Sequence, residues 1–138
     1  MVNTIEINKA DIQTLESIFT NEDKQDVTVH FDNSIISSRV YINSLYEESK
    51  LYFYINNKEI VVQNIYVTNQ RIGIGTKLIR ECAHIGKIKG VNNIRVQSVL
   101  SDEMVYLCNK LNFKQDMNRR LLDDKGDYIS AINNLFNC

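Results

Sequence analysis

The sequence predicts a mixed α/β fold, in which helices flank a central, mostly antiparallel sheet. In the first half, apolar residues alternate with polar ones in a pattern typical of half-buried strands joined by short turns. After residue 73 the apolar spacing becomes helical, and strands and helices then follow one another without a linker or repeat. A chain of 138 residues has room for one domain, residues 1–138, that buries about two-thirds of its unfolded surface. This order of elements does not predict a doubly wound parallel sheet.

The first half predicts one helix followed by two hairpins. Residues 2–7 alternate weakly and could form a strand before the helix. Asn8 is a suitable N-cap for that helix, whose apolar stripe consists of Ile12, Leu15, Ile18 and Phe19. Residues 27–42 then predict a hairpin that turns at residues 32–34. Residues 51–67 predict a second hairpin around Asn56-Asn57, with residues 59–67 as its long return strand.

The second half predicts two helices with a strand between them, and then a final hairpin. The first helix begins after Gly73 and ends at Gly90, because glycine is a typical C-terminal stop. Residues 93–100 form the strand, and Ser101 is a suitable N-cap for the second helix. The chain closes with a hairpin of residues 121–122 and 128–132.

Composition excludes several classes of protein. The 16 Lys and Arg nearly balance the 17 Asp and Glu, so the chain lacks the positive field of a dedicated nucleic-acid binder. No apolar run approaches the roughly 20 residues of a membrane span, and the first residues do not resemble a signal peptide. Three cysteines, an odd number, form no disulfide framework. We therefore expect a cytoplasmic protein with neither a membrane nor a nucleic-acid partner.

No metal site is expected either. Cys82 and His84 stand two residues apart on a predicted helix, so they point to different faces and do not form a ligand pair. Asp123, Asp124 and Asp127 resemble a calcium loop superficially, but the later glutamate of such a loop is missing and a hairpin turn explains them better.

Two of the five glycines stand together after the long strand of residues 59–67. Amides in the first turn of a helix have no intrahelical acceptor, and the helix dipole makes that end positive. Gly73 and Gly75 would therefore let the backbone approach a phosphate closely. A tight turn into a packed helix is the alternative, because the pattern lacks the further glycine of a dinucleotide fingerprint and the Gly-Lys-Ser/Thr of a P-loop.

A longer motif surrounds these glycines. Residues 70–75 read Gln-Arg-Ile-Gly-Ile-Gly and fit the pattern Q/R-x-x-G-x-G/A between a strand and an amphipathic helix. In this respect the sequence resembles the GNAT superfamily of acyl-CoA-dependent N-acyltransferases. Residues 108–113, Cys-Asn-Lys-Leu-Asn-Phe, are similar to the Tyr-Glu-Lys-Leu-Gly-Phe that ends the family's final motif. The resemblance covers about residues 51–113 and implies a mostly antiparallel sheet splayed around a cofactor groove.

The region before residue 51 matches the family less well. The hairpin predicted over residues 27–42 stands where many members have a second helix. Residues 20–50 would shape the acceptor pocket, so this departure leaves the acceptor unassigned.

The resemblance implies which residues bind the co-substrate, acetyl-CoA. The amides of Ile72, Gly73, Ile74, Gly75 and Thr76 would hold the pyrophosphate, with the Thr76 hydroxyl as a further donor. The backbone of Ile65, Tyr66 and Val67 would pair with the pantetheine arm, and an amide there would polarise the thioester carbonyl. Gln70 and Arg71 flank the loop and either contact phosphate or stay solvated. Ser101 stands where the family usually has an asparagine that contacts the cofactor arm, or it is simply an N-cap.

Acetylation of an amine requires a group that takes a proton from the ammonium. Glu59 lies eleven residues before Gln70, a spacing similar to that of the strand glutamate that serves as base in the histone-acetylating members. Glu59 could instead be an ordinary exposed hairpin residue. The sequence does not rank the remaining candidate bases, which are Glu6, Glu47, Glu48, Asp32 and His30.

The departing thiolate benefits from a proton donor, and here the sequence departs from the family. Alignment on Phe113 places Cys108 where the family usually has its tyrosine. The Cys108 thiol could protonate the thiolate, or the residue could simply fill the apolar face of its helix. Tyr106 stands two residues earlier, about 200° around the helix, and is a poor substitute.

We therefore expect an acetyl-CoA-dependent N-acetyltransferase that acetylates a primary amine of a small molecule or peptide by direct attack in a ternary complex. The first alternative is a non-catalytic acyl-CoA-binding module for sensing or assembly, which Cys108 in place of tyrosine suggests. The second is an anion site for another phosphorylated ligand. The strand at residues 128–132 could contribute an edge to a homodimer.

Overall fold

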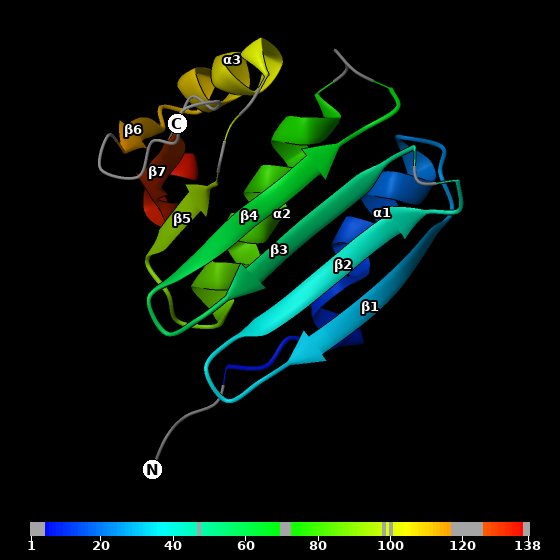
Figure 1. Ribbon diagram of the computed structural model, residues 1–138, viewed down its shortest axis with the longest axis horizontal. Coiled ribbons are helices and arrows are strands. Elements are labelled where there is room, and N and C mark those ends of the chain that lie inside the picture. The colour runs from blue at the N-terminus through cyan, green and yellow to red at the C-terminus, as the bar shows by residue number, and fades with distance from the viewer. Residues whose placement is uncertain are drawn as a thin grey trace.

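Seven strands form one sheet in the computed structural model of the chain, which describes residues 5–46, 48–69, 73–97, 99, 101–116 and 126–136. The strands lie in the order β1-β2-β3-β4-β5-β7-β6 (Figure 1). Their bounds are β1 Val27–Asn33, β2 Ser38–Ser44, β3 Lys50–Ile55, β4 Glu59–Tyr66, β5 Asn93–Val96, β6 Lys114–Asp116 and β7 Asp127–Ala131. Among these strands β4 and β5 pair in parallel and the other neighbours pair antiparallel. The mixed, mostly antiparallel sheet predicted from the sequence is confirmed.

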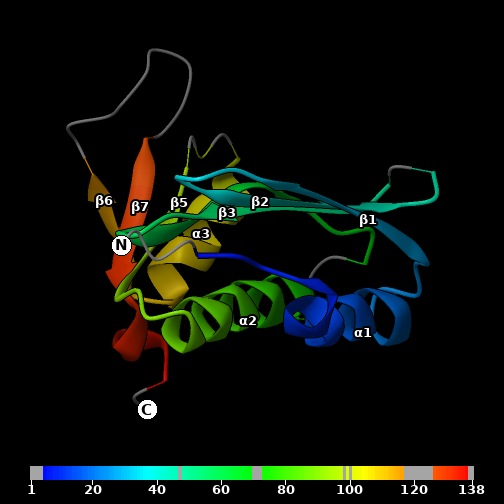
Figure 2. The ribbon, with the colours of Figure 1, turned by 90° about the horizontal axis from the view of Figure 1, so that it is seen from below.

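Helices cover one face of this sheet. The short η1 (Lys9–Ile12) leads into α1 (Gln13–Asn21), and α1 and α2 (Ile74–Ile88) lie side by side beneath the strands (Figure 2). Asn8 caps η1 in a reciprocal capping box with Asp11, as its residue type predicts. The buried core lies between the two layers and includes Leu15, Phe19, Val40, Ile42, Leu51, Phe53, Ile60, Val62, Leu78 and Ile79. Within the described ranges, none of the helices has both the length and the apolar character that a bilayer span requires.

One predicted strand is wrong in its described part, and another lies outside the described residues. The described part of the expected first strand, residues 5–7, forms no strand. Ile7 is instead buried, and its N–H donates to Ser38 Oγ of β2 (3.1 Å), so this segment fills the core beside the sheet. The last hairpin pairs β7 with β6, whereas residues 121–122, the predicted partner, lie outside the described residues. The two hairpins predicted from residues 27–42 and 51–67 are present, as the antiparallel pairs β1–β2 and β3–β4.

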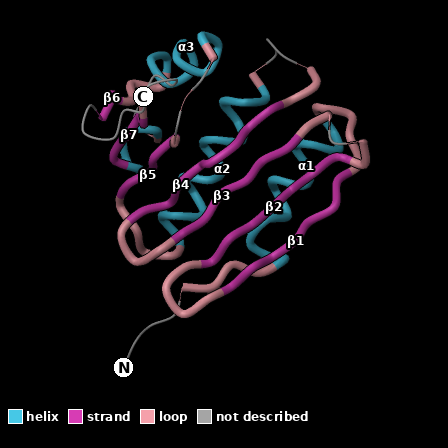
Figure 3. Tube along the Cα trace, in the orientation of Figure 1, coloured by secondary structure: helices cyan, strands magenta, loops and turns pink. Residues whose placement is uncertain are grey.

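The ends of the parallel strands place two connections together. The C-terminal ends of β4 and β5 point the same way, so the loops leading to α2 and to α3 (Asp102–Lys110) leave the same end of the sheet (Figure 3). The chain ends in a short helix, η3 (Ile132–Leu135), that packs against α2. Ligands of open α/β sheets commonly bind at the carboxyl ends of parallel strands, so a binding site is expected at this end.

Candidate active site

Strands β4 and β5 separate half-way along β4, after Val62. Residues 59–62 pair with residues 93–96, and the Gln97 N–H then donates to the Val62 carbonyl oxygen (2.9 Å). β4 continues to Tyr66, whereas β5 ends at Val96. On that side the described backbone of residues 63–66 therefore has no partner strand. A strand edge of this kind can pair with an extended ligand, because its backbone groups seek partners.

A β-bulge lies where the two strands separate. Tyr52 of β3 pairs with Asn64, but the next residue, Phe53, pairs with Val62, so Gln63 is an extra residue in β4. A bulge bends its strand and changes the direction of nearby side chains. The bulge lies at the point where β4 and β5 separate, and this point is here called the vertex.

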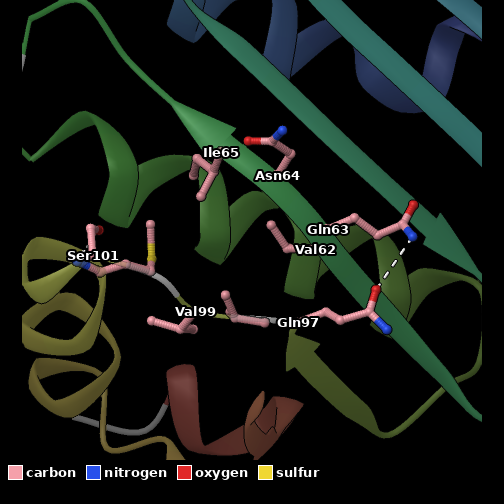
Figure 4. Close-up of a pocket in the computed structure, with 9 residues that line it drawn as sticks. Val62, Gln63, Asn64, Ile65, Gln97, Val99 and Ser101 are labelled. Carbon is pink, nitrogen blue, oxygen red and sulfur yellow. Dashed lines mark hydrogen bonds between the residues drawn. The ribbon is translucent and has the colours of Figure 1, made fainter. Parts of the chain in front are cut away.

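Amide side chains gather at this vertex. Gln63 Nε2 donates to Gln97 Oε1 across the opening (3.3 Å), and Arg39 Nη1 donates to Gln63 Oε1 (3.2 Å). Figure 4 shows the two glutamine side chains pointing toward one another, with Asn64 next along β4. The vertex is therefore polar, and its amide groups can both donate and accept hydrogen bonds.

Two adjoining cavities extend from the vertex. The smaller, of about 250 Å³, is lined by Val62, Gln63, Asn64, Ile65, Val96, Gln97, Val99, Ser101 and Met104. The larger, of about 740 Å³, reaches from β4 to α2 and α3. Ile65, Ser101 and Met104 line both cavities, so the two cavities adjoin, and together they are here called the central groove. The larger volume lies within the usual range for small-molecule sites.

The N-terminus of α2 opens onto the larger cavity. Gly73 precedes the helix in the left-handed conformation (φ +83°), which would strain a residue with a side chain. The Lys77 N–H makes a helical bond to the Gly73 carbonyl oxygen (3.1 Å), so the amides of Ile74, Gly75 and Thr76 precede the intrahelical ladder. Residues 73–76 all line the cavity. The groove thus has, at one extremity, a positive helix end and first-turn amides that have no acceptor within the helix.

Most of the predicted acetyl-CoA residues lie along this groove. The larger cavity is lined by Ile65, Tyr66, Val67, Gly73, Ile74, Gly75, Thr76 and Ser101. The other three, Gln70, Arg71 and Ile72, lie outside the described residues. A place on the cavity wall is necessary for contact with the co-substrate but does not establish it, so these assignments remain predictions.

Helix α3 forms the wall opposite β4. Ser101 caps it, because Ser101 Oγ accepts the Met104 N–H (3.1 Å). Ser101 also lines both cavities, so the capping role and a contact with a ligand are compatible. A Cβ atom on Gly75 would lie 3.2 Å from Leu107 Cδ2, so the missing side chain lets α3 approach α2 closely.

Cys108 lies on the buried face of α3. Its side chain is 0% exposed and is not among the residues that line the two cavities. Burial raises the pKa of the Cys108 thiol to about 12, so the thiol keeps its proton at neutral pH. Tyr106 is 71% exposed and lines the larger cavity, although the sequence argument set it aside. The role of Cys108 as proton donor remains a prediction.

Glu59 begins β4 and belongs to a cluster of charged side chains. Its carboxylate accepts a hydrogen bond from Arg95 Nε (3.1 Å), and Arg95 Nη1 donates to Asp116 (2.8 Å) and Asp127 (3.1 Å). Burial acts to lower the pKa of Arg95, but hydrogen bonds to Asp116, Glu59 and Asp127 outweigh it and raise the pKa. Glu59 is not among the residues lining either cavity, and its role as general base remains a prediction.

The other candidate bases do not line the groove where the structure describes them. Glu6, Glu48, Asp32 and His30 are absent from both cavity walls, and Glu47 lies outside the described residues. Asp102 and Glu103, in the first turn of α3, do line the larger cavity. In the part of the chain that is described, no three His, Cys, Asp or Glu residues are placed to hold a metal ion.

Sequence reasoning did not select several residues of the groove. Gln63, Asn64 and Gln97 meet at the vertex because of the bulge and the separation of β4 from β5. Lys110 lines the larger cavity from the last turn of α3. No local sequence signal marks Gln63, Asn64 and Gln97, since strand register depends on the partner strands, whereas Lys110 stands within the motif of residues 108–113.

Comparison with known proteins identifies the fold. Neither a family model nor a curated protein sequence matches this chain. A GNAT-family acetyltransferase from Staphylococcus aureus Mu50 is similar in structure, with a TM-score of 0.50 and 13% identity, over 91% of this chain and 81% of that chain. PaiA N-acetyltransferase from Thermoplasma acidophilum, in complex with coenzyme A, gives 0.52 and 15% over 70% of this chain and 62% of that one. The anti-CRISPR protein AcrVA5 gives 0.50 and 18% over 61% and 90%.

The chain therefore has the fold of the GNAT acetyltransferases, as the motif at residues 70–75 led us to expect. The low identities limit this finding to the fold.

Proposed function

We propose that this chain is an acetyl-CoA-dependent N-acetyltransferase that acetylates a primary amine of a small molecule or peptide. The observation that carries the proposal is the central groove, whose two adjoining cavities share the lining residues Ile65, Ser101 and Met104. It joins the N-terminus of α2, which suits a pyrophosphate, to the vertex between β4 and β5, where a thioester would lie. The GNAT fold supports the use of an acyl-CoA, and one structural neighbour was solved with coenzyme A.

In this proposal the groove binds acetyl-CoA in two parts. The amides of residues 73–76 would bind the pyrophosphate, with the Thr76 hydroxyl close by. The pantetheine arm would lie along the unpaired edge of β4 at Ile65, Tyr66 and Val67 and take hydrogen bonds like an added strand. The acetyl group would then reach the vertex.

The chemical step would be a direct attack in the ternary complex. The amine nitrogen forms a bond to the thioester carbonyl carbon, and the carbonyl oxygen takes up negative charge that an unpaired β4 amide would stabilise. The C–S bond then breaks, the sulfur leaves as a thiolate that accepts a proton, and the nitrogen loses its extra proton. Glu59 and Cys108 are the proposed base and acid, and solvent can replace either at a lower rate.

Binding and turnover test the proposal separately. Isothermal titration should detect acetyl-CoA with a dissociation constant on the order of tens of micromolar or less. A thiol-release assay over simple amines, polyamines and peptide N-termini should then find at least one acceptor. Absence of binding would exclude both the enzyme and an acyl-CoA-binding module. Binding without thiol release from any acceptor would favour the non-catalytic module.

Two glycines at opposite ends of α2 provide a matched pair for the binding site. Gly73 (φ +83°) and Gly90 (φ +92°) are both left-handed, and an added Cβ meets no atom within 4 Å at either. Substitution by alanine should therefore strain both positions similarly, by about 1–2 kcal/mol. We expect Gly73→Ala to weaken acetyl-CoA binding by about tenfold, or about 1.4 kcal/mol, and Gly90→Ala to leave it unchanged. Equal affinities of the two variants for acetyl-CoA would contradict binding of the pyrophosphate at the N-terminus of α2.

A further inference from the structure

We propose that Asp23 is the residue that positions the anion-binding end of the central groove, acting through the loop between β4 and α2. This inference rests on the proposed function, because it assumes that acetyl-CoA occupies the groove. Asp23 follows α1 and is 0% exposed. It lines neither cavity, so it would act through other residues and is not a catalytic residue.

The Asp23 carboxylate holds three hydrogen-bond donors from two other segments. Oδ1 accepts the Asn69 N–H (2.8 Å), and Oδ2 accepts the Thr68 N–H (3.4 Å) and the Ser49 hydroxyl. Asn69 Nδ2 donates in return to the Asp23 main-chain oxygen (2.8 Å). Ser49 Oγ also accepts the Thr68 N–H (2.9 Å). A buried carboxylate is costly unless it is hydrogen-bonded in this way.

These contacts fix the start of the loop that leads into α2. Thr68 and Asn69 follow β4 after one intervening residue, Val67, and Asn69 itself lines the larger cavity. Glu22, next to Asp23, forms an ion pair with Lys77 in the first turn of α2. The turn after α1 therefore holds both the beginning of the loop and the helix whose amides face the groove.

An ionised carboxylate is suited to this role. It has two acceptor oxygens and no donor, so it can accept the amides of consecutive loop residues at once. A loop held in place before the ligand arrives loses little conformational freedom when the ligand binds. Loss of this anchor should therefore weaken binding of the phosphate-bearing part of acetyl-CoA more than it affects chemistry at the vertex.

The test compares two acyl donors in Asp23→Asn. Asparagine keeps the size of the side chain, but its amide nitrogen cannot accept a hydrogen bond, so at least one of the hydrogen bonds to the side chain of residue 23 is lost. The donors are acetyl-CoA and S-acetyl-N-acetylcysteamine, which carries the thioester but no pyrophosphate. We expect the KM for acetyl-CoA to rise at least tenfold with kcat within about threefold, and kcat/KM for the truncated donor to stay within about twofold.

Two further variants make the result decisive. Ser49→Ala removes one donor and one acceptor of the same network and should show the same donor-dependent effect, about threefold in KM, even if Asp23→Asn does not fold. Asp26→Asn removes an exposed carboxylate three residues further on and should change KM by less than about twofold. Equal losses with both donors, or no loss in Asp23→Asn and Ser49→Ala, would overturn the positioning role. A wild-type protein inactive with both donors would instead overturn the proposed function, and this inference with it.

Discussion

Cys108 shows how burial changes the chemistry of a single residue. Thiols ionise near pH 9 in an exposed setting, but burial raises the pKa of Cys108 to about 12 and that of Cys82 further. The folded state thus keeps both thiols protonated where the unfolded chain begins to lose those protons. The cysteine at the tyrosine position is therefore a protonated thiol in the buried core, and it is not among the residues that line the groove.

This difference predicts a pH-dependent stability. The contribution of the thiols is fully present below about pH 8.5 and declines as pH rises toward the folded-state pKa, by about 1.4 kcal/mol per pH unit for each thiol. We expect the free energy of unfolding, measured in urea between pH 8 and pH 10, to fall less steeply in Cys82→Ala/Cys108→Ala than in the wild type. The variant should also be less stable at pH 7, where only the lost packing counts. Parallel slopes would contradict the buried-thiol interpretation.

At the scale of elements, α3 shows a departure from the family motif that preserves conformation. Asn112 stands where the motif has glycine, and it adopts the left-handed conformation (φ +64°) that ends the helix. The Phe113 N–H then donates to the Cys108 carbonyl oxygen (2.9 Å), which is the bond expected of a Schellman motif. Asparagine is the residue other than glycine that tolerates this conformation best, so Asn112 here and the glycine of the family motif allow the same helix end.

Substitutions at Asn112 should follow this conformational requirement. Asn112→Gly should leave stability unchanged or raise it slightly, whereas Asn112→Val should lower the free energy of unfolding by about 1–2 kcal/mol. Thermal and urea unfolding of the two variants provide the measurement. Because Asn112 is exposed, lost burial contributes little to the comparison. If valine were tolerated as well as glycine, the left-handed cap would not be the reason for the residue.

At the scale of the whole molecule, the Glu59 cluster joins four strands. Glu59 lies on β4, Arg95 on β5, Asp116 on β6 and Asp127 on β7, so the guanidinium on β5 links β4 on one side to β7 and β6 on the other. The side chains are mostly shielded from solvent, and hydrogen bonds to charged groups in such a setting contribute about 1.5–3 kcal/mol each. The cluster therefore holds the C-terminal strands to the rest of the sheet.

Comparison of Glu59→Gln with Asp116→Asn distinguishes a structural role of Glu59 from a catalytic one. Each removes one carboxylate charge from Arg95, and each should lower the free energy of unfolding by about 1–3 kcal/mol. If Glu59 is also the base, only Glu59→Gln should lower kcat, by about 100-fold, and abolish the acidic limb of the pH–rate profile. Comparable activity in the two variants at a temperature where both are folded would leave Glu59 with the structural role alone.

The elements of this fold were largely predictable from the sequence because their signals are local. Asn8 and Ser101 cap the helices that follow them, and Gly90 ends α2, since each acts on backbone groups within a few residues. Hairpins joined by short turns are predictable for the same reason. The prediction of a strand was wrong for residues 5–7, because the Ile7 N–H donates to a distant acceptor, the Ser38 hydroxyl, which no local pattern reveals.

The sequence by itself determined the order of helices and strands and the glycine-rich start of α2. Tertiary structure decided how these parts meet. Gly86 is an example, because an added Cβ would lie 2.9 Å from Ile132 Cδ1 and 3.0 Å from Ile60 Cγ2, contacts that only the packed fold creates. The hydrogen bonds from Asn69 to Asp23 and from Arg95 to Glu59 likewise join segments far apart in the sequence. The point where β4 and β5 separate also depends on how two distant segments pair. Such contacts depend on register and packing, which are properties of the assembled sheet and not of any one segment.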